Sequence, residues 1–310
     1  LSVLWLLYVY ALFAVCAIAR RGRYRWWIAG ALAVAMLLVT ARFNALQFER
    51  GSLYVTALDV GQGESVALLR KSREVGLPVF VCFSWRYMLL PRYMKKLVDD
   101  GILGNLYHVY IRCVKDSGLW VGRRLEWRFI EERSGTGVLC DLGSHMFDMI
   151  RFFGEEFESA YCDRGTIVKR RQKIDSDEWG DVTTDDWSNV NFRLKSGIGA
   201  NVIISRCVTN EKDTIEFYLV GEKGSLKFIS DSSGHHLYRC TGEDCKTNSF
   251  VEIKPPEDFK AGGQSRSYID LLNGHPDEYA AEIYEGMRSQ AAVDAAKLSS
   301  ETGRMITIKE

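Results

Sequence analysis

Residues 189–229 read NVNFRLKSGIGANVIISRCVTNEKDTIEFYLVGEKGSLKFI and hold four short apolar or alternating runs separated by turn residues. Runs of this kind predict β-strands. Strands so close together in sequence pair antiparallel, because a parallel pair needs a long crossover connection. We therefore expect a largely antiparallel sheet with strands at Asn189–Leu194, Ala200–Ser205, Thr214–Val220 and Ser225–Ile229.

The segments on either side extend this pattern. Helices are indicated where apolar residues recur at three- and four-residue spacing, and strands where apolar and polar residues alternate. Together they predict an α+β fold: an open, mainly antiparallel sheet with helices on one face. Further strands are expected at Val79–Phe83, Tyr107–Val114, Ser159–Val168 and Met305–Lys309, and helices at Pro91–Asp100, Asp141–Phe153 and Asp277–Ser300.

The first 46 residues are of another kind. Two apolar runs, Leu1–Ala19 and Trp26–Ala41, flank the basic cluster Arg20–Arg25. The first run is about as long as the hydrocarbon core of a bilayer is thick. This predicts an apolar helical hairpin that contacts the membrane through residues 1–41, with the basic loop in the cytoplasm. The alternative is a pair of buried core helices. The remainder is of a cytoplasmic type, so membrane association depends on this hairpin.

Residues 47–70 predict a strand followed by a glycine turn. Gly61-Gln62-Gly63 begins like a dinucleotide-binding fingerprint, but Val66 stands where the third glycine is needed. We therefore expect no complete Rossmann domain in this chain. Paired apolar helices followed by LDVGQGES resemble the ComEC family of competence DNA-uptake channels, at the entry to its metallo-β-lactamase-like domain. The metal-binding HxHxDH segment of that fold is absent from the sequence, so the resemblance implies no hydrolase activity.

Composition argues against a nucleic-acid partner and gives no metal motif. Forty basic and forty acidic residues leave a formal net charge of zero, whereas nucleic-acid binders usually show a basic excess. The eight cysteines form no CxxC pair. Cys240 and Cys245 flank a turn with His235 and His236 nearby, but the spacing fits no standard zinc pattern. We expect no metal site, and a hairpin with two incidental thiols at this position.

Asp141 and His145 are the strongest catalytic candidates. Residues four apart on a helix project from the same face, so both side chains can reach one ligand. A neutral histidine can accept a hydroxyl proton near physiological pH, and a carboxylate can orient that hydroxyl or the imidazole. The alternative is a capping aspartate beside a histidine that is satisfied in the core.

The order of motifs after residue 71 is similar to the C-terminal domain of the Gfo/Idh/MocA oxidoreductases, the inositol and sugar dehydrogenase family. The motifs are individually weak, and their shared order carries the resemblance. In chain order they are Phe83–Tyr87, Gly101–Gly104, Trp127-Arg128, Ser134–Leu139, Asp141–Asp148, Asp185-Asp186, Val220–Leu226 and Asp294–Ser300.

The resemblance implies a substrate domain across residues 71–310 that acts with NAD or NADP on a polyol or sugar. It further implies a homo-oligomer that pairs through the sheet face. The implied roles are as follows: His145 is the acid/base, Asp141 orients the substrate, Arg86 and Tyr87 approach the nicotinamide, Trp127 and Arg128 form the substrate wall, and Asp148 holds the backbone or His145 on the substrate side.

The chain also departs from the family pattern. The Glu-Lys-Pro motif, whose lysine assists proton transfer, has no counterpart, and Lys71 lies in the wrong element to replace it. We therefore expect weak or no NAD(P) binding and a truncated or chimeric oxidoreductase. Two alternatives stay open: a membrane-anchored, non-catalytic binding or assembly module, and a DNA-uptake component supported only by residues 1–70.

Overall fold

The structure is a computed structural model that describes residues 74, 76, 79–120, 122–275 and 277–309. The chain divides into Leu1–Asp59 and Val60–Glu310, and every described residue lies in the second unit. The predicted apolar hairpin, the strand-turn segment of residues 47–70 and the incomplete nucleotide fingerprint lie outside the described residues. Among the described residues, none belongs to a helix with the length and apolar character needed to span a bilayer.

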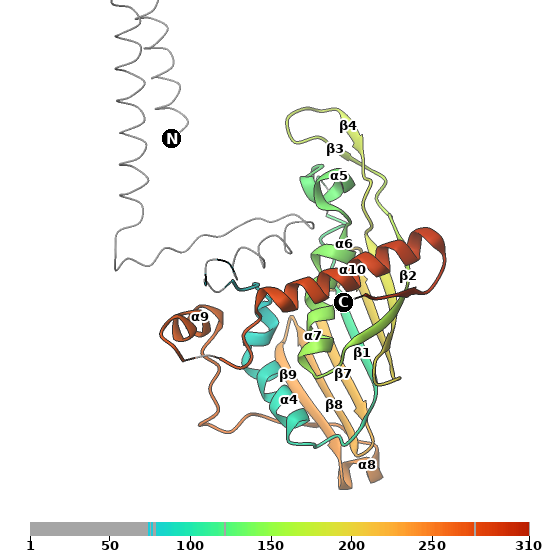
Figure 1. The fold of residues 1–310 in the computed structure, drawn as a ribbon. Helices are drawn as coiled ribbons and strands as arrows, with labels where there is room; N and C mark the ends of the chain where they lie inside the picture. The colour runs from blue at the N-terminus through green and yellow to red at the C-terminus, as the bar shows by residue number, and fades with distance from the viewer. Residues whose placement is uncertain (1–73, 75, 77–78, 121, 276, 310) are drawn as a thin grey trace, which may run out of the picture. The chain divides into compact units, whose positions relative to one another are not determined.

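A nine-stranded sheet organises the described part of the chain (Figure 1). Every expected strand from Tyr107 onward is present, within a few residues of its predicted ends. β9 and β10 pair antiparallel where the sequence predicts a hairpin around Cys240 and Cys245, although no strand bounds were predicted there. The strands are β1 Leu106–Val114, β2 Phe157–Gly165, β5 Trp187–Leu194, β6 Gly199–Ser205, β7 Thr214–Gly221, β8 Gly224–Asp231, β9 Gly234–Thr241, β10 Val251–Glu252 and β11 Ile306–Thr307.

The sheet has the order β10-β9-β8-β7-β1-β6-β5-β2-β11. All of these pairs are antiparallel except β1 and β6, which pair in parallel with Val109 opposite Ala200. The expectation of a mainly antiparallel open sheet is therefore confirmed. The parallel pair is central, and it brings the carboxyl ends of β1 and β6 to the same end of the sheet.

Helices cover one face of the sheet, as Figure 1 shows for α4 (Leu89–Asp99), α7 (Gly143–Phe152) and α10 (Ile283–Thr302). The expected helix at Asp277–Ser300 begins later, at Ile283, because Glu282 and Glu285 form a capping box there. An additional helix that the sequence did not indicate, α9, spans Gln264–Leu272.

Two sequence predictions differ from the structure. The helix expected over Asp141–Phe153 is divided at Leu142 into α6 (Val138–Asp141) and α7. The strand expected at Val79–Phe83 is an extended segment with one isolated bridge, from Phe80 to Glu282. The remaining short elements are η1 Ser84–Tyr87, η2 Trp127–Phe129, α5 Glu131–Ser134, β3 Arg170–Gln172, β4 Trp179–Asp181 and α8 Glu243–Thr247.

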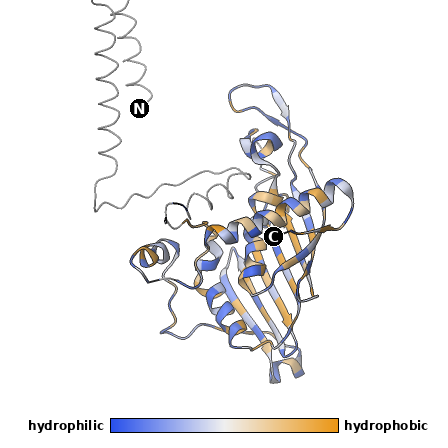
Figure 2. Cartoon of the chain, viewed as in Figure 1, coloured by the Kyte–Doolittle hydropathy of each residue, from blue (hydrophilic) through white to orange (hydrophobic). Residues whose placement is uncertain are grey.

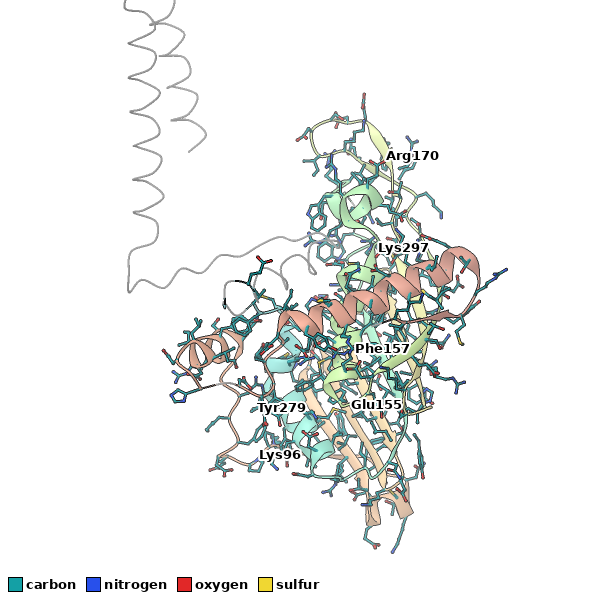
Figure 3. All side chains as sticks on the ribbon, viewed as in Figure 1. Lys96, Glu155, Phe157, Arg170, Tyr279 and Lys297 are labelled. Carbon is teal, nitrogen blue, oxygen red and sulfur yellow. The ribbon has the colours of Figure 1, made fainter. Side chains whose placement is uncertain are left out.

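The core lies between the helices and the covered face of the sheet. Alternate residues of each strand point into it, and Figure 2 shows the apolar positions alternating along the strands. Each large apolar side chain that is fully buried contributes about 1.5–3 kcal/mol. Fully buried members include Ile111 and Phe217 from the sheet and Met146, Met149 and Ile150 from α7. Figure 3 labels Phe157 at the start of β2, which stacks near the rings of Phe147 and Phe192 in this core.

Candidate active site

A cavity of about 510 Å³ lies at the end of the sheet where β1, β6 and β8 finish and β7 begins. Asp141, at the end of α6, and His145, in the first turn of α7, both line it. The expectation that these two side chains share a cavity therefore agrees with the structure. The other lining residues are Ser84, Trp85, Cys113, Lys115, Ser117, Arg123, Arg128, Val138, Leu142, Met146, Arg206, Asp213, Ile215 and Ser230.

His145 lies in the cavity wall with its Nδ1 buried and without a hydrogen-bond partner among the described residues. The edge of its ring meets Phe83, with the ring centroids 5.4 Å apart. Burial lowers the pKa of His145 below 6.5, and the Asp141 carboxylate opposes this shift. The imidazole is therefore neutral near pH 7 and can accept a proton.

The junction between α6 and α7 is what lets His145 approach the sheet. Gly143 begins α7, and a Cβ at this position would lie 3.1 Å from Ile204 Cδ1 and 3.2 Å from the Phe147 ring. The absence of a side chain therefore permits close packing of the helix on β6. Ser144 supports the junction, because its hydroxyl donates to the Cys140 carbonyl at 2.7 Å.

Asp185 holds the start of α6 and so positions Asp141. Its Oδ1 accepts the Gly137 N–H at 2.7 Å, and its Oδ2 accepts the Leu139 N–H at 2.9 Å. Only 2% of Asp185 is exposed. The carboxylate thus satisfies backbone donors at the helix start, where no intrahelical acceptor exists. The sequence had singled out Asp185-Asp186 as a motif without assigning it this role.

Arg128 connects the cavity to Trp127. Its Nε lies 3.7 Å from Asp141 Oδ2, and both side chains are partly exposed. The guanidinium also lies 4.5 Å from the centroid of the Trp127 ring. Trp127 itself is exposed and does not line the cavity. Of the two residues expected in the substrate wall, only Arg128 is therefore found there.

Arg86, Tyr87 and Asp148 are not among the residues that line this cavity, although Ser84 and Trp85 of η1 are. Arg86 donates to both oxygens of Asp148, at 2.6 and 2.7 Å, and all three residues are buried. The Tyr87 hydroxyl accepts the Ala281 N–H at 3.0 Å. These polar groups are engaged inside the protein, where an unpaired charge or hydroxyl would be costly.

The structure adds cavity residues that the sequence analysis missed. Lys115 directly follows β1 and Arg206 directly follows β6, so the parallel pairing of these strands places both at one edge. The Lys115 N–H donates to the Ser205 carbonyl at 2.9 Å. Their position immediately after predicted strands was the available signal. The prediction of a mainly antiparallel sheet did not indicate which two strands would pair in parallel.

Each charged side chain that lines the cavity is in an ion pair, and Arg123 and Arg206 pair with carboxylates outside the lining. This leaves a lining rich in donors and acceptors without a large excess of one sign, which suits a ligand that carries several hydroxyl groups. The pairs are Lys115 with Asp213 at 3.2 Å, Arg123 with Glu126 at 3.1 Å, Arg128 with Asp141 at 3.7 Å and Arg206 with Asp186 at 2.7 Å.

Cys113 also lines the cavity, but burial raises the pKa of its thiol to about 12. It therefore stays protonated at neutral pH and is a poor nucleophile. Within the described ranges, no group of three or more His, Cys, Asp or Glu side chains is arranged to hold a metal ion. His145 with Asp141 remains the chemically competent pair in this cavity.

Comparison with known proteins connects this arrangement to a family. Residues 92–227 match the family described as "GFO/IDH/MocA C-terminal domain". Glucose-6-phosphate 3-dehydrogenase of Bacillus subtilis is 26% identical over 241 residues, which cover 74% of this chain and 67% of that protein. Levoglucosan dehydrogenase of Pseudarthrobacter phenanthrenivorans is 24% identical over 177 residues, which cover 53% of this chain and 45% of that protein.

Solved structures agree with this relationship. An oxidoreductase domain protein from Kribbella flavida superposes with a TM-score of 0.69 at 25% identity, covering 80% of this chain and 72% of that one. Levoglucosan dehydrogenase in complex with NADH and levoglucosan gives a TM-score of 0.69 at 18% identity, covering 80% and 71%, which shows a shared fold. These matches lend no support to the ComEC resemblance, to a chimeric chain or to a membrane anchor. They show that residues 92–227 of this chain are similar to the C-terminal domain of the GFO/IDH/MocA oxidoreductases.

Proposed function

We propose that this chain provides the substrate-binding and proton-transfer side of a dehydrogenase that oxidises a hydroxyl group of a sugar or polyol. The observation that carries the proposal is His145, a neutral imidazole in a polar cavity whose buried Nδ1 has no hydrogen-bond partner among the described residues. A histidine satisfied within the core would have such a partner.

His145 acts as the general base for the substrate hydroxyl. The oxygen–hydrogen bond of the alcohol breaks and its proton passes to the imidazole. Formation of a carbonyl group would also require the hydride on the adjacent carbon to pass to an acceptor, which is considered below. In the reverse direction the imidazolium returns the proton to the carbonyl oxygen. General acid–base catalysis by a positioned side chain typically contributes about 10²–10⁴-fold in rate.

Asp141 orients the substrate and Arg128 positions Asp141. The Asp141 carboxylate can accept hydrogen bonds from sugar hydroxyls while its field favours the imidazolium that forms during proton transfer. Arg128 contacts this carboxylate from the cavity side at 3.7 Å. Because the Arg128–Asp141 pair is partly exposed and long, a bound hydroxyl can insert between the two groups at little cost.

The substrate class follows from the lining and from the relatives. A cavity of about 510 Å³ accommodates a monosaccharide, and its paired charges offer both donors and acceptors. The two relatives described above are named for glucose 6-phosphate and levoglucosan, which are both carbohydrates. We therefore propose a carbohydrate or polyol as substrate.

Oxidation also needs a hydride acceptor, which is a nicotinamide in the solved structures of levoglucosan dehydrogenase with NADH. Arg86 and Tyr87 were expected near it, but their polar groups are engaged with Asp148 and the Ala281 N–H. With these internal partners, the polar groups of Arg86 and Tyr87 do not fit a cofactor-binding role. We propose that NAD(P) binding by this chain is weak or absent. Micromolar affinity for NADH or NADPH in isothermal titration would contradict this.

We further propose that the chain forms a homo-oligomer through the uncovered face of the sheet. Tyr110 on this face stacks on Tyr218, with the ring centroids 5.7 Å apart. Exposed apolar surface of this kind often marks a protein–protein contact. The large exposed apolar side chains on strands β1, β2 and β6 are Tyr107, Tyr110, Tyr161 and Ile203.

Carbohydrate binding tests the proposed function without depending on a cofactor. Ligand-observed NMR on the full chain, with a panel of neutral sugars, sugar phosphates and polyols, would identify a bound class. We expect His145→Asn and Asp141→Asn to weaken binding several-fold. The same substitution at His236, which is outside the cavity and pairs with Glu252, should leave binding unchanged. Absence of any bound carbohydrate, or equal binding by the His145 variant, would overturn the proposal.

A further inference from the structure

Cys240 and Cys245 form a close thiol pair at the end of the sheet opposite to the cavity. Cys240 is the penultimate residue of β9 and Cys245 lies within α8. Their Sγ atoms are 3.9 Å apart. Cys245 is exposed and Cys240 is buried. Figure 1 shows α8 at the far end of the sheet from α5 and α6.

The fold, rather than chance side-chain positions, holds this pair together. The chain reverses at Gly242, whose φ of +57° is in the left-handed region that favours glycine. The Cys245 N–H then donates to the Gly242 carbonyl at 3.3 Å. Arg239 and Asp244 form an ion pair at 3.3 Å across the same turn. The Cys245 thiol consequently lies 3.4 Å from the Cys240 carbonyl oxygen.

A disulfide bond has a sulfur–sulfur distance of about 2.05 Å, so the two thiols need to approach by roughly 2 Å. Rotation of the exposed Cys245 side chain, together with a small movement of the short helix α8, can supply this. None of the backbone ladder between β8 and β9 has to open, because Cys240 already sits in register opposite Ser225. The geometry therefore needs a local adjustment only.

We propose that Cys240 and Cys245 are a reversible dithiol–disulfide site that reacts with oxidised small-molecule disulfides such as oxidised glutathione. The thiolate of Cys245 attacks one sulfur of glutathione disulfide, which forms a mixed disulfide and releases one glutathione thiolate. The thiolate of Cys240 then attacks the Cys245 sulfur and releases the second glutathione. Two protein thiols are oxidised to one disulfide, glutathione disulfide is reduced to two thiols, and two protons pass to these thiols.

Cys82 is an internal comparison for this site. It is also exposed, but its recorded neighbour is the Tyr268 hydroxyl at 4.0 Å rather than a second thiol. It can therefore form a mixed disulfide with glutathione, and no thiol of the described residues lies beside it to resolve that disulfide. Cys245 has a second sulfur beside it and Cys82 does not. We therefore expect an internal disulfide as the oxidation product at Cys245 and a mixed disulfide at Cys82, although both cysteines are exposed.

Peptide mapping of the full chain tests the proposal. Cleavage after Arg239 and Lys246 releases residues 240–246 as one tryptic peptide that contains both cysteines. After equilibration of the folded chain in glutathione buffers, acid quenching and alkylation, we expect this peptide to lose two hydrogens and to carry no alkyl group. Dithiothreitol should restore two alkylated thiols. The Cys82 peptide should carry glutathione or an alkyl group and no internal disulfide.

A matched variant and an unfolded reference complete the test. In Cys245→Ser, Cys240 should remain available for alkylation after unfolding at every glutathione ratio. In the wild type, the disulfide should form at a more reducing glutathione ratio in the folded chain than in urea. If the disulfide formed at the same glutathione ratio in the folded chain and in urea, the fold would not favour disulfide formation between Cys240 and Cys245. Retention of two glutathione adducts or two free thiols in the folded peptide would overturn the proposal, whatever the outcome of the carbohydrate-binding test.

Discussion

Arg86 and Asp148 form a buried bidentate ion pair, although 62 residues separate them in the sequence. The pair connects η1, beneath the cavity, to the middle of α7, and Asp148 is completely buried. The Arg86 guanidinium also lies 5.3 Å from the centroid of the Phe152 ring. Burial raises the pKa of Asp148 to about 6, and the hydrogen bonds from Arg86 oppose that shift. These residues therefore support the helix that carries His145.

Removing one partner of this pair should be much more harmful than removing both. Arg86→Met leaves a buried carboxylate without a partner, and we expect the free energy of unfolding to fall by about 3–5 kcal/mol. Arg86→Met combined with Asp148→Leu should recover most of that loss, because no unpaired charge remains. Urea denaturation of the two variants measures the difference. A double variant as unstable as the single one would contradict this account.

The exposed pair of Lys96 and Asp100 on α4 is the matched control for that comparison. Their atoms lie 2.7 Å apart, but about half of each side chain is exposed. Lys96 is labelled in Figure 3. Because solvent screens such pairs, Lys96→Met should leave the urea midpoint of unfolding nearly unchanged.

The stability of the folded chain should depend on His145 at mildly acidic pH. Burial lowers the pKa of His145 in the folded state below its unfolded value of 6.5. The unfolded state therefore binds this proton first, and folding stability decreases as the pH falls below about 6.5 toward the folded pKa. The difference in stability between the wild type and His145→Asn isolates this effect from the Asp148 titration, which has the opposite sign. A difference that is constant from pH 7 to 5 would contradict the burial of the imidazole.

Arg128 should affect carbohydrate binding more than stability. Arg128→Met removes the cation beside Asp141 and a donor in the cavity, so we expect binding to weaken by roughly 10–150-fold, which corresponds to one hydrogen bond with a charged group. The same substitution at the neighbouring Arg124, which is exposed and contacts backbone carbonyls at Lys173 and Ser176, should have little effect. Titration of both variants with the carbohydrate found for the wild type measures this. Equal losses in the two variants would remove Arg128 from the site.

Asp185 should be important for the position of α6. Asp185→Ala leaves the Gly137 and Leu139 N–H groups buried without an acceptor, and we expect a loss of at least about 2 kcal/mol in unfolding free energy. Asp185→Asn keeps one carbonyl oxygen and should lose less. Carbohydrate affinity should fall in both variants, because Asp141 ends this helix. Unchanged stability in the alanine variant would contradict the role of Asp185 as the acceptor at the helix start.

The uncovered sheet face should determine the oligomeric state. Tyr110→Glu replaces an exposed ring near the centre of this uncovered face with a charge, so we expect the proposed oligomer to dissociate into monomers. Ile174→Glu, at a position that is 60% exposed on the β3–β4 hairpin, is the control and should leave the state unchanged. Light scattering coupled to size-exclusion chromatography measures the mass. A monomeric wild type, or an unchanged mass for the Tyr110 variant, would refute the oligomer.

Much of the fold could be predicted from local patterns. Alternation of apolar and polar residues predicted β2, β5, β7 and β8, because one covered sheet face requires a period of two. The order of these strands, with few residues between them, predicted antiparallel pairing. By contrast, β9 was predicted only as part of a hairpin without bounds, because its residues 234–241 include two histidines and a tyrosine that obscure the alternation. The division of the Asp141–Phe153 helix was missed because Leu142 gives no local signal for a break.

Only part of the candidate site could be predicted from local sequence patterns. His145 and Asp141 could be found from their spacing, since a helical turn brings residues four apart to one face. Lys115 and Arg206 could not be placed together, because their proximity depends on the parallel pairing of two strands distant in sequence. The pairing of Arg86 with Asp148 could not be predicted for a similar reason, because 62 residues separate them in the sequence. Two opposite charges that are buried away from water attract each other strongly, so each side chain is held by its partner and is not free to bind a ligand.

The amino-acid sequence alone therefore determined the kinds of elements, their order and the histidine–aspartate pair, because these depend on residue periodicity over a few turns. Tertiary structure alone decided which charges face the cavity and which are sequestered in the core. That choice depends on long-range strand pairing and on the cost of burying an unpaired charge, and neither is encoded in any single segment.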